Sequence, residues 1–208
     1  FYNAVNMEEI NQGLKLPPIY REKYQIPDEA IVIAFAGRIL PEKGIIPLIK
    51  AVKRINEQQT KVYLFIAGEG PLESFVEKEK DNYIIPLGRI EHQEVFRLLG
   101  ESDIFCLPSF SEAFCGAVLE AVACKCYVIT TERGGSKELI SSPDLGTILP
   151  DNKEETVYRG LKEVIEHWDS RKNSVEKVYK ILKENFTWDI IAQKVENMNL
   201  SELNGGKR

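Results

Sequence analysis

The sequence predicts an α/β fold, a doubly wound parallel sheet of about six strands followed by C-terminal helices. Short apolar runs alternate with amphipathic stretches over residues 30–149, and the loops that join them are short. From residue 150 onward the pattern changes to amphipathic stripes without strand-like runs between them. Strict alternation implies right-handed crossovers and a parallel sheet that helices cover on both faces.

The clearest predicted strand covers residues 30–36, which are apolar throughout and therefore fit a central strand buried on both faces. Residues 1–6 are expected as an entry strand or linker, and 19–24 as one or two helical turns. The other expected strands cover 61–67, 82–87, 103–107, 126–130 and 147–149. The expected helices between them cover 45–57, 72–79, 92–100, 116–123 and 136–140.

Three apolar stripes at helical spacing follow the predicted sheet. The first holds Val157, Leu161, Val164, Ile165 and Trp168, the second Val175, Val178, Tyr179 and Leu182, and the third Trp188, Ile191, Val195 and Met198. Thr187 is expected to cap the third helix at its N-terminus. Such stripes ordinarily pack against a core, and we expect the same here.

Composition excludes several classes of function. The net charge of −5 argues against a nucleic-acid binder that works through a broad basic field. No apolar run approaches the roughly 20 residues of a membrane-spanning helix. The four cysteines (Cys106, Cys115, Cys124 and Cys126) form no CxxC pair, and only two histidines accompany them. We therefore expect no zinc site, but reduced and mostly buried thiols in a cytoplasmic protein.

The candidate functional loops all follow predicted strands, at 37–44, 68–70, 88–91, 108–116 and 131–136. They should therefore lie along one edge of the sheet, where ligands of such folds bind.

The most informative stretch is 108–121, PSFSEAFCGAVLEA. It places Glu112 on a loop after a strand and Glu120 on the first turns of the following helix. Between them, the backbone N–H groups of about 114–117 point out of the helix N-terminus and are free to bind an anion. Donors for phosphate and acceptors for hydroxyls at one site suit a sugar nucleotide.

The loop at 37–44, GRILPEKG, adds two cations directly after the central strand. Gly37 permits close approach of the backbone to a ligand, and Arg38 and Lys43 suit a diphosphate.

These motifs resemble a known family. The Glu-x7-Glu pattern after PS-x-x-E and the GR-x-x-P-x-KG loop are similar to the donor site of retaining GT-B glycosyltransferases, specifically family 4. The resemblance implies one Rossmann-like half of a GT-B fold. It implies a nucleotide-sugar-binding domain at 1–186, a crossover helix and tail at 187–208, and an N-terminal acceptor domain that this chain lacks. The family's terminal helix crosses back onto that N-terminal domain, so part of the third stripe is expected to be exposed in its absence.

The resemblance also implies roles for the phosphate and sugar contacts. Arg38 and Lys43 would hold the donor phosphates and offset charge on the leaving diphosphate. Glu112 would contact hydroxyls of the transferred sugar, and these three residues are the expected catalytic set. Glu120 would accept hydrogen bonds from the ribose.

Further donor contacts follow from the same resemblance. Gly37, Arg89 and Ile90 would border the nucleotide, the last two beside the base. Backbone groups at Phe114, Cys115 and Gly116 would face the sugar or phosphate. Cys115 departs from the glycine of many relatives, so we expect an altered pocket shape there.

The activity implied is retaining transfer of a hexose to a hydroxyl of a glycan or lipid-linked glycan, as in polysaccharide biosynthesis. No Asp-x-Asp motif occurs, so we expect no metal and no cofactor. The donor is expected to be a UDP-sugar rather than a GDP-sugar. The isolated domain would transfer nothing useful, and peripheral membrane contact would belong to the full-length protein. A sugar-nucleotide epimerase of the same fold and a non-catalytic nucleotide-binding module remain as alternatives.

Overall fold

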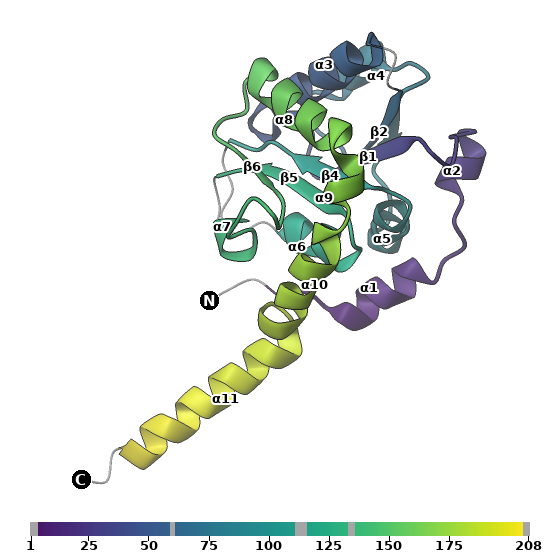
Figure 1. Cartoon of the computed structure of the whole chain (residues 1–208). Coiled ribbons are helices and arrows are strands. Elements are labelled where there is room, and N and C mark those ends of the chain that lie inside the picture. The colour runs from purple at the N-terminus through teal and green to yellow at the C-terminus, as the bar shows by residue number, and fades with distance from the viewer. Residues whose placement is uncertain (1–3, 59–60, 111–115, 133–135, 206–208) are drawn as a thin grey trace.

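Six strands form one parallel sheet with the order β3-β2-β1-β4-β5-β6 (Figure 1). This computed structural model describes residues 4–58, 61–110, 116–132 and 136–205. The strands are β1 (Ile31–Ala36), β2 (Val62–Ala67), β3 (Ile84–Gly88), β4 (Ile104–Leu107), β5 (Tyr127–Thr131) and β6 (Thr147–Leu149). The strand order reverses direction beside β1, which pairs with both β2 and β4. The prediction of a doubly wound parallel sheet of six strands is confirmed.

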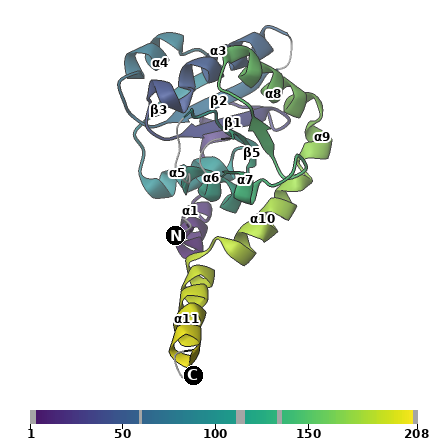
Figure 2. The same cartoon turned by 90° about the vertical axis from the view of Figure 1, so that its left-hand side faces the viewer.

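Helices cover both faces of the sheet, as the alternation predicted (Figures 1 and 2). One face carries α3 (Ile45–Asn56), α4 (Glu73–Glu79) and α8 (Glu154–Glu166), and the other α5 (His92–Gly100), α6 (Gly116–Ala123) and α7 (Ser136–Leu139). The bounds of α3 to α7 agree with the predicted ones to within one residue. The sheet is therefore withdrawn from water on both sides.

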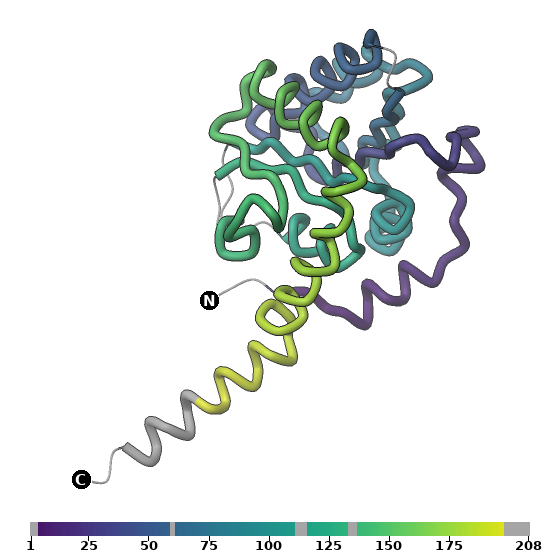
Figure 3. The backbone as a smooth tube through the Cα atoms, in the orientation of Figure 1, coloured from purple at the N-terminus to yellow at the C-terminus, as the bar shows by residue number. Residues whose placement is uncertain are grey.

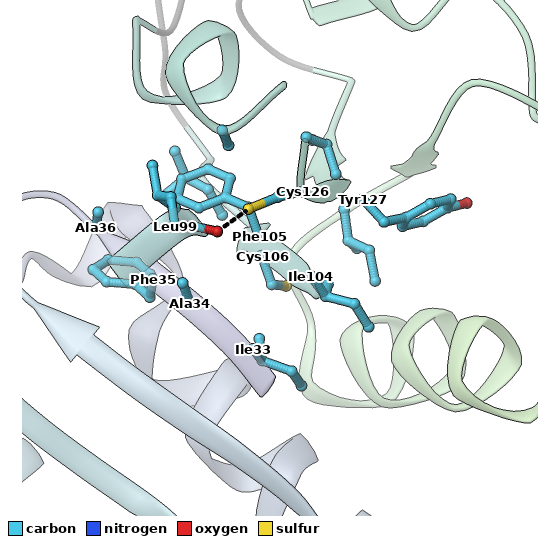
Figure 4. Packing of buried hydrophobic residues seen from close by; sticks show 14 of the residues in the cluster. Ile33, Ala34, Phe35, Ala36, Leu99, Ile104, Phe105, Cys106, Cys126 and Tyr127 are labelled. Atoms are coloured by element: carbon cyan, nitrogen blue, oxygen red, sulfur yellow. Dashed lines mark hydrogen bonds between the residues drawn. The ribbon is translucent and has the colours of Figure 1, made fainter. Parts of the chain in front are cut away.

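The centre of the core lies between β1, β4 and β5 (Figure 4). Phe35 and Phe105 are fully buried there. The thiol of Cys126 donates to the carbonyl oxygen of Leu99 at 3.2 Å, and burial raises the pKa of the Cys106 thiol. The expected buried, unpaired thiols are confirmed for Cys106, Cys124 and Cys126, while Cys115 lies outside the described residues.

The first helix, α1 (Met7–Leu14), was not predicted. Asn6 caps it, because its side-chain oxygen accepts from the backbone N–H groups of Glu8 and Glu9 at 3.1 and 3.3 Å. This capping residue followed by two acidic residues was the sequence signal available. The helix packs on α5, where a Cβ on Gly13 would lie 2.6 Å from the Cβ of Phe96. A second short helix, α2 (Tyr20–Lys23), lies within the predicted 19–24.

The C-terminal part comprises α8, α9 (Trp168–Arg171), α10 (Ser174–Asn185) and α11 (Trp188–Gly205). The first two predicted stripes do pack on the core, with Leu161 and Leu182 fully buried. The third does not, because α11 projects away from the sheet and leaves Trp188 54% exposed (Figure 3). Core packing is thus confirmed for the first two stripes, and the expected exposure of part of the third is confirmed at Trp188. None of the described helices combines the length and hydropathy needed to cross a lipid bilayer.

We predict that Gly13→Ala destabilises the fold by about 1–2 kcal/mol, since the new methyl group must displace Phe96 from a packed interface. Urea unfolding measures the change, with Gln12→Ala, an exposed position on the same helix, as the neutral control. Equal stability of both variants would contradict the packing of α1 on α5.

Candidate functional site

The loops that follow β1, β2 and β3 are joined by backbone hydrogen bonds at the carboxyl edge of the sheet. The amide of Gly37 donates to the carbonyl of Ala67 at 3.0 Å, and that of Gly68 donates to Gly88 at 2.8 Å. The approach is close, since a Cβ on Gly68 would lie 1.9 Å from the carbonyl oxygen of Gly37. Glycine is thus required at 68 for these loops to meet.

The loop after β1 also meets the loop after β4, at the point where the strand order reverses. The amide of Phe110 donates to the carbonyl of Glu42 at 2.6 Å, and the Ser109 hydroxyl donates to the same carbonyl at 3.2 Å. Gly44 has a left-handed φ of 73°, and a Cβ there would lie 2.2 Å from the carbonyl oxygen of Pro108. Loops whose contacting residues, such as Ser109 and Glu42, are 67 positions apart in sequence are therefore held together where α/β sheets bind ligands.

A pocket of about 260 Å³ opens at the ends of β1, β2 and β3. It is lined by Ala36, Gly37, Arg38, Ala67, Gly68, Glu69, Arg89, Ile90 and Val95. Four of the predicted donor-site residues, Gly37, Arg38, Arg89 and Ile90, are thus brought together in one wall. Arg89 pairs with Glu69 at 3.1 Å, and both side chains are largely exposed.

Two larger hollows lie elsewhere on the described surface. One of about 560 Å³ borders β6 and contains the Arg171–Glu163 ion pair, and one of about 600 Å³ contains the Arg21–Asp103 pair just before β4. Neither contains a predicted site residue. The smaller pocket is the candidate because it lies at the carboxyl ends of the strands beside the switch point.

Lys43 lies at the other end of the same loop as Arg38. It ends the 3₁₀ turn η1 (Pro41–Lys43), which Gly44 follows before α3 begins. Its side chain is half-buried, whereas that of Arg38 is exposed. The two predicted phosphate ligands therefore flank the loop that contacts residues 108–110.

Glu120 is the predicted ribose acceptor, and it lies half-buried on α6. Its Oε1 lies 3.1 Å from Nε2 of His92, the first residue of α5. Burial raises the pKa of the Glu120 carboxyl, and the neighbouring His92 opposes this shift. Sequence reasoning weighed His92 only as a metal ligand and missed this contact, because no local pattern joins the two residues.

Three predicted site residues, Glu112, Phe114 and Cys115, lie outside the described residues. Gly116 is the first residue of α6 and lies directly after them. The predicted roles of all four remain predictions.

Residues 18–181 match the family profile described as "Glycosyl transferases group 1". This match covers well over half of the chain. The chain belongs to the group 1 glycosyl transferases. A relative among curated proteins is the phosphatidylinositol N-acetylglucosaminyltransferase gpi3 subunit of Schizosaccharomyces pombe, 30% identical over 81% of this chain and 38% of that protein.

Solved structures of glycosyltransferases share the fold. Anabaena HepE in complex with UDP has a TM-score of 0.79 at 19% identity, over 96% of this chain and 56% of that one. The C-terminal domain of a group 1 family protein (LpcC) from Francisella tularensis has a TM-score of 0.70 at 23% identity, over 90% of this chain and 96% of that one. The chain thus has the fold of a GT-B C-terminal domain.

This chain matches only part of the length of its curated relatives. The chain spans between 36% and 52% of the four curated proteins that include the fission-yeast relative.

We predict that Glu120→Gln stabilises this domain at neutral pH. The raised pKa means that the folded state binds a proton at Glu120 more tightly than the unfolded state. The wild type therefore loses stability as pH rises through the carboxyl range, and a neutral amide avoids this loss.

Urea unfolding at pH 4 and pH 7 measures the free energy of unfolding of both proteins. The difference in favour of Glu120→Gln should be larger at pH 7 than at pH 4. Glu196→Gln, an exposed position on α11, is the matched control. A variant less stable than wild type at pH 7 would contradict the burial penalty.

Proposed function

We propose that the chain is the donor-binding half of a retaining, family 4 glycosyltransferase. It takes a nucleotide-diphosphate sugar and serves transfer of a hexose to a hydroxyl acceptor, a glycan or lipid-linked glycan. The observation that carries this proposal is the pocket beside the switch point, with Arg38 in its wall and the loop of Lys43 held against the loop of residues 108–110. Membership of a transferase family favours transfer over epimerisation.

The pocket and the predicted site residues around it each suit a part of the donor. Arg38 and Lys43 supply positive charge for the diphosphate. Arg89 and Ile90 border the space for the base, and Glu120 supplies an acceptor for the ribose hydroxyls. Glu112 is proposed to hold the transferred sugar, and backbone groups at 114–116 to face the sugar or phosphate.

The proposed chemistry is mainly electrostatic. The acceptor oxygen attacks the anomeric carbon on the face from which the diphosphate departs, so the C–O bond to the leaving oxygen breaks as the new one forms. The leaving diphosphate oxygen takes the proton of the acceptor hydroxyl. Arg38 and Lys43 stabilise the negative charge that develops on this diphosphate, which is the role of preorganised cations in such sites. We propose that these side chains act without a metal ion.

The relatives indicate the ligand classes. The HepE structure holds UDP, and the name of the fission-yeast relative describes transfer of N-acetylglucosamine to a phosphatidylinositol. We therefore propose a UDP-sugar donor and a lipid-linked acceptor, bound by a further domain of the whole protein. This chain alone would bind donor weakly and would not turn it over at a useful rate. Free thiols in the core fit a cytoplasmic site of action.

Calorimetric titration of this chain with UDP and GDP tests the proposal. We expect saturable binding of UDP and a loss of about tenfold to a hundredfold in affinity for Arg38→Ala, because a charge-assisted phosphate contact is removed. Lys43→Ala should act in the same direction.

Lys50→Ala is the matched control, since Lys50 is a cation on α3 that pairs with Glu154 at 3.4 Å and does not line the pocket. Its affinity should stay within about twofold of wild type. Equal losses in the control and in Arg38→Ala, or no binding of either nucleotide at millimolar concentration, would refute the donor site.

A further inference from the structure

A chain of three side chains joins three helices beside the pocket. Nδ1 of His92 lies 3.0 Å from Oε1 of Glu9 on α1, and Nε2 of the same ring lies 3.1 Å from Oε1 of Glu120 on α6. His92 itself begins α5, and its ring also packs against Phe96 with centroids 4.5 Å apart. Both ring nitrogens therefore face carboxylate oxygens.

The two contacts fix the orientation of the imidazole. A rotation of the ring that takes one nitrogen away from its carboxylate also moves the other nitrogen. On the same helix, the charged side chains of Glu94 and Arg97 pair with each other at 3.1 Å.

The bridge is continuous with the candidate site. The segment 89–95 gives Arg89, Ile90 and Val95 to the pocket wall and His92 to Glu120. Glu120 is 24% exposed, and burial disfavours its ionised form. The contact with Nε2 of His92 opposes that penalty and leaves the second carboxylate oxygen for a ligand.

We propose that His92 is a positioning residue of the donor site: it fixes the Glu120 carboxylate toward the ribose hydroxyls, and Glu9 fixes His92. The inference rests on the proposed function, because it assigns a partner to the ribose acceptor. It brings α1, which lines no part of the pocket, into nucleotide recognition. It also predicts that the contribution of His92 is confined to ligands with ribose hydroxyls.

A ligand-based cycle separates this role from a purely structural one. UDP and 2′,3′-dideoxy-UDP are titrated calorimetrically into wild type, His92→Phe and Glu9→Gln; GDP and its dideoxy analogue replace them if GDP is the nucleotide bound. His92→Phe keeps a ring against Phe96 and removes both ring nitrogens.

Wild type should prefer UDP over the dideoxy analogue by about tenfold. In His92→Phe this preference should fall to about twofold or less, through weaker binding of UDP with little change for the analogue. Glu9→Gln should reduce the preference to a smaller extent. His167→Ala, which replaces the other histidine at the end of α8, should keep the wild-type preference.

The outcomes are distinct. An undiminished preference for UDP in His92→Phe, with unfolding midpoints showing that the variant is folded, overturns this inference and leaves the proposed function standing. Equal losses for both ligands also overturn it, since they indicate a general structural effect. No binding of either nucleotide to wild type overturns the proposed function and this inference together. If His92→Phe does not fold, Glu9→Gln is compared with wild type instead. An undiminished preference of Glu9→Gln for UDP over the dideoxy analogue then overturns this inference.

Discussion

The contact between Gly44 and Pro108 holds the site together. It joins the loop after β1 to the loop after β4, the two loops that border the reversal in strand order. Because the approach is backbone to backbone, no side chain at residue 44 would fit without moving one of the loops. The loop of Arg38 and Lys43 and residues 108–110 take their relative positions from this contact. The arrangement of the candidate site thus depends on glycine at position 44.

The strands of the sheet and the loops between them were predictable because each strand has a recognisable apolar pattern within a few consecutive residues. β1 is an uninterrupted apolar run, and the alternation around it allows few topologies for a parallel sheet. Once the strands are parallel, their carboxyl ends lie at one edge, so Gly37, Arg38, Arg89 and Ile90 could be expected near one another. The pocket that these four residues line confirms that they lie together, as the topology predicted, whereas their assignment to a donor site came from the family resemblance.

The contacts of His92 and the packing of α11 depend on tertiary structure, and no local sequence pattern indicates them. His92 looks like an ordinary helix-start residue in the sequence, and its partners Glu9 and Glu120 lie far from it along the chain. The stripe that begins at Trp188 has the spacing of a core-facing helix, yet whether it packs depends on what lies opposite it. The helix α1 is the exception, because Asn6 and the two glutamates after it did mark its start.

The base of α11 is tied to the beginning of the described chain. Val5 donates to the carbonyl of Phe186 at 2.9 Å and accepts from the amide of Trp188 at 3.3 Å. Two residues after Val5, α1 begins, and α1 carries Glu9, which contacts His92 and through it Glu120. The projecting helix α11 is thus connected to Glu120 by a series of hydrogen bonds and side-chain contacts through Val5, α1 and His92, none of which belongs to the sheet.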